Sequence, residues 1–149
     1  MRDVNTPLRK AYVDAIGGIT YNGSLLKVYD GIVPDSVVAG KEEYLYVLIA
    51  DQTDNDSVRT KNMISHDSTI MVQVYHGVTG GTGRKKVDDV AGLILNAVNT
   101  VTSSGFLNLS ASNLDIVTTT VISDVTDLFS TKSHKVWRRN MRFRHNISE

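Results

Sequence analysis

The 149-residue sequence contains no cysteine, and this absence excludes several kinds of chemistry. Without thiols the chain has no disulfide framework, no thiolate zinc site and no cysteine nucleophile, and it is indifferent to its redox compartment. No apolar run approaches the roughly 18–20 residues that a membrane span needs. The first residues also lack the apolar core of a secretory signal. We therefore expect a protein that is made in the cytoplasm and has no membrane partner.

A surplus of charge of either sign is also missing. Sixteen Lys and Arg side chains balance sixteen Asp and Glu side chains, so the net charge is zero. A general nucleic-acid binder needs excess Lys and Arg for contacts with phosphates, and the balance argues against that class. Hydrophobic residues make up 41% of the chain and charged residues 21%, which is typical of a globular protein. A chain of this length forms one domain, which we expect to span residues 1–149.

Periodic apolar residues predict two helices. The first begins at Thr6–Pro7, where Thr6 can cap the helix and Pro7 suits its first turn. It ends at the left-handed stop that Gly17–Gly18 can supply. The second helix runs from Arg84 to Val101, with its apolar residues on one face, and residues 103–105 stop it.

Segments of strand type account for most of the remaining chain. A short candidate covers residues 25–30, and two strong strands cover about 43–51 and 67–76. A Thr-rich strand at 114–122 and a basic strand at about 135–146 follow the second helix. Consecutive strands with few helices between them favour antiparallel pairing. We therefore predict an α+β fold of order α-β-β-β-α-β-β, in which an antiparallel sheet of about four to five strands packs against two helices.

The glycine-rich connection at residues 77–83 joins a strand to a helix, as phosphate-binding loops do. It lacks both the Gly-Lys-Ser/Thr ending and the G-x-G-x-x-G spacing, so a flexible connection is the better interpretation. Cations begin the helix, where the helix dipole disfavours positive charge, and Asp88 and Asp89 can offset part of that cost. A solvated basic turn and a surface for an acidic partner both remain open for these cations, which are Arg84, Lys85 and Lys86.

The segment at residues 51–57 lies between the two strong strands and is rich in Asp and Asn. A calcium loop of the EF-hand type fails here, because neither possible register places a glycine and a glutamate where that loop requires them. We expect a solvated hairpin loop, with an acidic interaction loop as the alternative. Its candidate residues are Asp51, Asp54 and Asp56.

The sequence shows no pattern of residues that indicates catalysis or ligand binding. The four histidines form no helical metal pair, and the serines form no G-x-S-x-G elbow. The aspartates are not spaced as an acid/base dyad. We therefore predict no catalytic residues, no metal ligands and no cofactor.

The C-terminal stretch at residues 132–145 holds six Lys or Arg side chains and no acid, whereas residues 28–67 hold eight acids and three bases. Alternation along a strand places Trp137, Arg139, Met141 and Phe143 on one face and Asn140 with the other arginines on the opposite face. An ordinary solvated sheet face is one interpretation of this basic surface. The other is head-to-tail packing between identical subunits, through Arg138, Arg142 and Arg144.

Several local patterns, together with this order of elements, resemble one protein family. The patterns are Thr6–Tyr12, Val28–Asp35, Tyr44–Thr53 and Val72–His76, followed by the single helix from Lys86 and the basic closing strand. They resemble the tail-completion proteins of tailed bacteriophages and prophages, which are also called tail terminator or tail-to-head joining proteins. The Thr-rich run at residues 117–121 has no counterpart in this pattern.

The resemblance implies a non-enzymatic structural protein of the virion that is made in the host cytoplasm. It implies an oligomeric ring, usually a hexamer, at the head-proximal end of the tail or at the head–tail junction. Such a ring caps the tail tube or joins tail to head. The implied partners are further copies of the chain, tail-tube and head-connector proteins, and genomic DNA that passes through the lumen without sequence-specific binding.

Like charge lining a DNA channel keeps DNA from sticking, so the acidic segment around Asp54 would face the lumen or a neighbouring subunit. Two alternatives remain beside the ring subunit. One is another head-completion or connector subunit of a phage. The other is a generic small α+β ligand-binding domain or enzyme.

Overall fold

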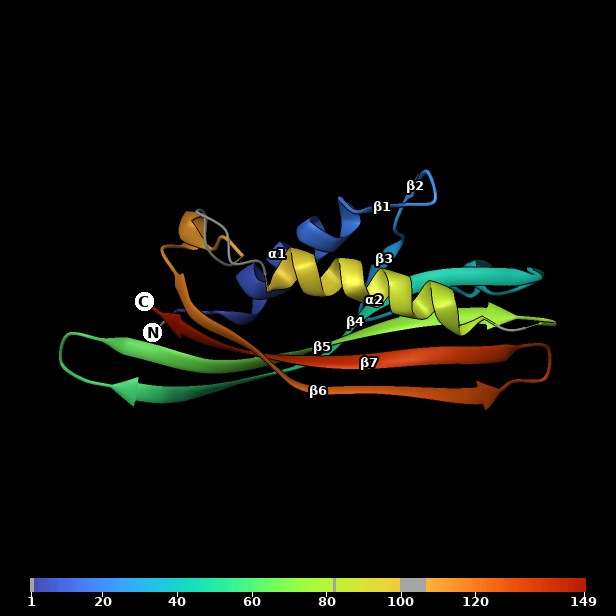
Figure 1. Ribbon diagram of the computed structural model, residues 1–149. Helices are drawn as coiled ribbons and strands as arrows, with labels where there is room; N and C mark the ends of the chain where they lie inside the picture. Colours follow the sequence, from blue (N-terminus) through green and yellow to red (C-terminus); the bar gives the residue numbers. More distant parts are fainter. Residues whose placement is uncertain (1, 82, 100–106) are drawn as a thin grey trace.

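The computed structural model describes residues 2–81, 83–99 and 107–149. A five-stranded sheet in the order β3-β4-β5-β7-β6 carries two helices on one of its faces (Figure 1). The helices are α1, Asn5–Gly17, and α2, Arg84–Val98. The strands of this sheet are β3 (Val28–Asp30), β4 (Glu43–Arg59), β5 (Ile64–Val78), β6 (Asp115–Ser130) and β7 (Lys135–Ser148).

The α+β class and the two helices are confirmed, but the prediction of an antiparallel sheet is wrong in one place. β3 pairs with β4 in parallel, with Val28 opposite Val47, whereas the other neighbours in the sheet are antiparallel. Parallel strands need a crossover of about a dozen residues, and residues 31–42 supply it with a 3-10 turn at Asp35–Val37.

The predicted order of elements also lacked a small ribbon that follows α1. Its strands are β1, Thr20–Tyr21, and β2, Ser24–Leu25, and they pair antiparallel. The turn between them uses Asn22 and Gly23, both at positive φ, which these residue types tolerate. With this ribbon the order becomes α-β-β-β-β-β-α-β-β.

The central strands are longer than the sequence predicts, and the expected hairpin loop at residues 51–57 is wrong. That segment belongs to β4, and the turn lies at Thr60–Met63, where the Thr60 N–H donates to the Met63 carbonyl at 2.8 Å. The segment has polar side chains on both faces, which is typical of a loop. In the fold, residues of β5 opposite this segment supply hydrogen-bond partners, such as the Ser68 hydroxyl that donates to Asp54 at 2.8 Å.

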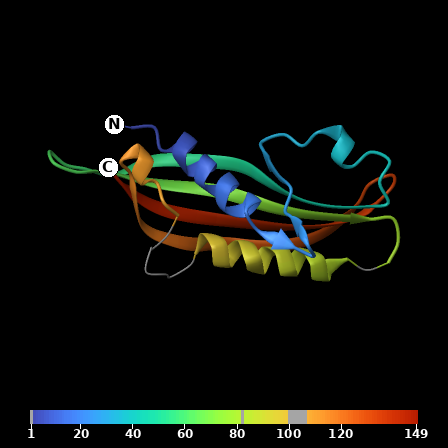
Figure 2. The ribbon, with the colours of Figure 1, turned by 90° about the horizontal axis from the view of Figure 1, so that it is seen from above.

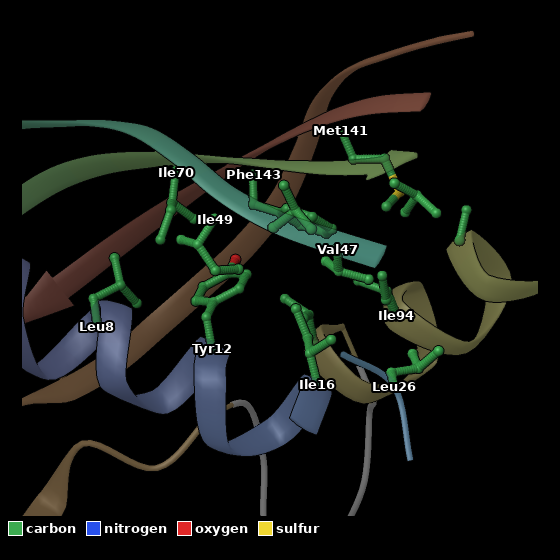
Figure 3. Close-up of a cluster of buried hydrophobic side chains, with 14 of the residues drawn as sticks. Leu8, Tyr12, Ile16, Leu26, Val47, Ile49, Ile70, Ile94, Met141 and Phe143 are labelled. Carbon is green, nitrogen blue, oxygen red and sulfur yellow. The ribbon is translucent and has the colours of Figure 1, made fainter. Parts of the chain in front are cut away.

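The main core lies between the helices and the sheet (Figure 3). α1 crosses the strands obliquely and α2 lies beside it on the same face (Figure 2). The predicted apolar face of α2 is confirmed, although Val101 and the stop at residues 103–105 lie outside the described residues. The residues of α1 and α2 that are buried in this core are Leu8, Tyr12, Ile16, Val87, Val90, Ala91, Ile94 and Val98.

The start of α1 differs from the prediction. Thr6 lies inside the first turn, because the helix begins at Asn5 and Val4 occupies the cap position without a side-chain cap. The Asn5 N–H donates to the Asp3 carboxylate at 3.0 Å. A hydrogen bond from the Thr6 side chain to this carboxylate, followed by that backbone bond, lowers the pKa of Asp3. Asp3 therefore takes the role that the sequence had assigned to Thr6.

One histidine is part of the core. His145 on β7 is fully buried, its Nε2 lies 2.5 Å from the Tyr12 hydroxyl, and its Nδ1 lies 2.9 Å from the Thr119 hydroxyl. Burial lowers the pKa of His145 to about 4, because a charged imidazole would lose its hydration there. The side chain therefore stays neutral at physiological pH and ties α1 to both β6 and β7.

We expect the free energy of unfolding to fall as the pH is lowered from about 6.5 to about 4. In this window His145 takes up a proton in the unfolded chain but not in the folded one, which costs about 1.4 kcal/mol for each pH unit. At pH 5 the loss is about 2 kcal/mol, and urea unfolding at several pH values measures it. The variant His145→Gln should have a lower free energy of unfolding at pH 7, but that free energy should change less with pH across the window. An equally steep profile for that variant would assign the loss to other groups.

Candidate assembly surfaces

The face of the sheet opposite the helices carries three of the four arginines of β7, whereas Arg139 lies on the helix side and pairs with Asp88 of α2. The predicted alternation is confirmed, because Met141 and Phe143 are buried on the helix side while their neighbours in sequence point to the other face. At one end of that face the 3-10 segment covers a second, smaller core that contains Tyr44, Tyr46 and Val136. Beyond this end the face carries Arg138, Arg142 and Arg144.

Arg138 is bound to the neighbouring strand β6. Its guanidinium donates two hydrogen bonds to the Asp127 carboxylate, at 3.1 and 2.7 Å, a bidentate geometry that fixes both side chains. The bond to Asp127 raises the pKa of Arg138 further above its already high value. On the side toward β5, the Tyr75 hydroxyl donates a hydrogen bond to the Gln73 side chain at 2.9 Å. The Gln73 amide in turn donates to the Asn140 side chain at 2.8 Å.

Arg142 and Arg144 pair with acids of the predicted acidic region. Arg142 reaches across β5 and donates to Asp51 on β4 at 2.7 Å and to the Thr69 hydroxyl at 3.2 Å. Arg144 pairs with Asp67 on β5, with its Nε 2.7 Å from the carboxylate. The acidic middle and the basic end of the sequence therefore meet within one subunit. A role of these arginines between subunits stays a prediction.

The part of the β4–β5 hairpin that leads to the turn at Thr60–Met63, residues 52–70, is called the arm. Asp54 and Asp56 lie on this arm, next to the buried His66. The His66 ring lies 3.2 Å from Asp54, 3.9 Å from Asp56 and, through Nε2, 3.0 Å from Glu149. Burial lowers the pKa of His66, but the hydrogen bond to Glu149 and the charge of Asp54 outweigh it, so the pKa is raised. The protonated ring therefore stabilises the arm at low pH, and this contribution is lost as the pH rises through the raised pKa.

Sequence reasoning missed this cluster because its members come from three separate parts of the chain. The partners of His66 in the fold are acids 12 and 83 residues away in the sequence. No sequence pattern indicated that the last residue, Glu149, contacts the arm. The assignment of Asp54 and Asp56 to an interface or a lumen stays a prediction.

The three cations at the start of α2 each have an acidic partner in their own chain. Arg84 pairs with Asp88 at 3.1 Å and Lys85 with Asp89 at 3.6 Å, so the expected offset by these helix acids is confirmed. Lys86 pairs with Glu43 at the start of β4. The bond from Lys86, followed by that from His76, lowers the pKa of Glu43. Whether Arg84, Lys85 and Lys86 also bind an acidic partner stays a prediction.

Among the residues that the structure describes, no group of three or more His, Asp and Glu side chains could hold a metal ion. None of the helices described is long and apolar enough to cross a membrane.

We expect Arg138→Gln to lower the free energy of unfolding by about 1 kcal/mol, because it leaves the half-buried Asp127 without its bidentate partner. The double variant that adds Asp127→Asn should recover part of this loss, since it removes the unpaired charge. Urea unfolding at pH 7 of Arg138→Gln, of Asp127→Asn and of the double variant measures these effects. If the double variant loses as much free energy of unfolding as the two single variants lose together, the pair is not coupled.

No family model matches the chain, and no curated protein sequence matches it. Among solved structures, a chain in the virion of a native gene transfer agent particle is similar over 97% of this chain and 90% of that chain, with a TM-score of 0.58 and 15% identity. A sheath/tube terminator of an extracellular contractile injection system in its extended state aligns over 98% of this chain and 57% of that chain, at 8% identity and a TM-score of 0.42. The chain therefore shares its fold with a chain of a gene transfer agent virion.

Proposed function

We propose that the chain is a structural subunit of a tail-completion ring in a tailed phage or a related particle. The observation that carries the proposal is the similarity of fold, over nearly the whole length of both chains, to a virion chain. The local sequence patterns that resemble tail-completion proteins support the same role. The ring would consist of about six copies, cap the tail tube or join tail to head, and have no enzymatic activity.

The charges of the subunit fit a role in which DNA passes without binding. The arginines of β7 are occupied by acids of their own chain, which leaves them less available to phosphates. The arm with Asp54 and Asp56 would face the lumen or a neighbouring subunit. Tail-tube or head-connector proteins would contact the ring at its ends, and the basic start of α2 at Arg84, Lys85 and Lys86 would face an acidic surface there.

A second candidate is a head-completion or connector subunit. The similar chain belongs to a virion, which holds head and tail components alike, so the similarity of fold fits this role as well as the tail role. Immunogold labelling of particles separates the two roles. Gold at the ends of free tail tubes supports the tail-completion ring, whereas gold on tail-free heads supports the connector.

Light scattering of the purified protein, with negative-stain images of the same fraction, tests the ring directly. Six copies of a 16.4 kDa chain give about 98 kDa, and we expect closed rings at this mass. If the ring forms only on a template, the protein stays monomeric alone but is present in purified particles. A chain that stays monomeric at millimolar concentration and is absent from particles of its own source would contradict the proposal.

A further inference from the structure

β6 forms a long open edge of the sheet. It pairs with β7 on one side, and no described strand pairs with its other side. Sixteen residues, Asp115–Ser130, make up this edge. The backbone groups along an unpaired edge are a template for another strand, so native proteins usually protect such edges.

The sequence of β6 provides little of that protection. Residues 116–122 are seven consecutive β-branched residues, Ile-Val-Thr-Thr-Thr-Val-Ile, without a charge, a glycine or a proline. Strands of this composition pair readily with other strands when they are exposed. Val117 is 51% exposed and Ile122 is 47% exposed. Bulges near these two residues are the protective devices that this segment has.

The acids farther along β6 are neutralised within the subunit. Asp124 accepts two hydrogen bonds from Arg139, at 2.8 and 2.7 Å, and Asp127 is held by Arg138. The edge therefore presents exposed aliphatic side chains without strong repulsion, since Val125 and Leu128 are also about half exposed.

The opposite edge of the same sheet is also open over part of its length. β3 covers only Val47–Ile49 of β4, so no described strand pairs with the outer side of residues 52–59. The acids of this stretch are again held by the subunit itself, Asp54 by Ser68 and His66 and Asp56 by Arg59. Val58 adds an aliphatic side chain that is 44% exposed.

The two open edges lie at the same level along the strands. Thr118 is opposite Asn146 of β7, which is opposite Asp67 of β5, which is opposite Asn55 of β4. Three successive antiparallel pairings separate β4 from β6, so these two strands run in opposite directions. A second copy placed beside the first by rotation about an axis along the strands would therefore present β4 antiparallel to β6.

We propose that the Thr-rich half of β6 pairs, antiparallel, with the open edge of β4 in a second copy of this chain. The contact joins two different edges, so it is heterologous, and repeated rotation closes it into a ring. A second copy suits the edge better than a foreign strand, because both edges belong to one sheet, match in level and direction, and have acids that are held by side chains of their own subunit. The inference rests on the proposed ring and deepens it by naming the contact between subunits.

Paired cysteines test this contact without background, since the chain has no cysteine of its own. We combine Asn55→Cys with Thr118→Cys, two exposed positions that face each other across the proposed contact. Within one subunit these positions are three strand spacings apart, about 14 Å, which is too far for a disulfide. Mild oxidation should therefore give a ladder of covalent oligomers on a non-reducing gel, up to the ring.

Matched variants define the register and the alternatives. Asn55→Cys is also combined with Thr120→Cys, Ser123→Cys and Val125→Cys, which lie farther along the same strand, and the ladder should fade along this series. A peak at Thr120 still supports the pairing of the Thr-rich half of β6 with β4 and gives the register, whereas a peak at Val125 would contradict it. Thr118→Cys alone should stay uncross-linked, and a covalent dimer of that variant would overturn the proposal in favour of β6 pairing with β6.

A charge placed on the edge gives an independent readout. Val117→Lys should abolish every species above the monomer in light scattering, because Lys blocks edge pairing. Val125→Lys, at a similarly exposed position of β6 level with the part of β4 that β3 covers, should assemble as the unaltered chain does. Far-UV circular dichroism confirms that both variants fold.

The outcomes separate this inference from the proposed function. If the unaltered chain forms rings but no cysteine combination gives a ladder, the edge contact is wrong and the proposed ring stands. The absence of both rings and ladders, at millimolar concentration and in particles, contradicts both proposals.

Discussion

The pairing of β5 with β7 runs from Ser65 and Ser148 to Val78 and Lys135 without a bulge, and the rest of the subunit depends on it. A slip of one residue would turn every side chain of β7 to the other face. Phe143 and His145 would leave the core under α1, and arginines would enter it. The register therefore fixes both the packing of the helices and the positions of the ion pairs on the opposite face.

Those ion pairs show how the equal numbers of acids and bases are arranged in the fold. The arginines of β7 pair with acids of strands on both sides, Arg138 with Asp127 on β6 and Arg142 with Asp51 on β4. Exposed pairs of this kind contribute little to stability individually. Together they leave little unbalanced charge on the face of the sheet that lies opposite the helices.

The sequence predicted well what periodicity encodes and poorly what depends on distant partners. The buried face of α2 and the two faces of β7 follow from spacing alone, because local geometry sets them. The stretch at 51–57 was mistaken for a loop because its acids find their partners, such as Ser68, His66 and Arg142, only after folding. The direction of β3 was missed for a related reason: three residues carry too little pattern to show which neighbour they pair with. The Thr-rich strand had no explanation until the order of strands placed it at an edge.

The two ends of the described chain lie close together at the end of the sheet that carries the β4–β5 arm (Figure 1). Arg2 donates to the Asn113 carbonyl at 2.8 Å just before β6, and the Glu149 N–H donates to the Ile64 carbonyl at 3.0 Å. The helix start with its three cations lies at the other end of the sheet. Each subunit is thus polar along its strands, and a fusion tag on either terminus would mark the same pole. In an electron micrograph of any assembly, such a tag would show which way the subunits point.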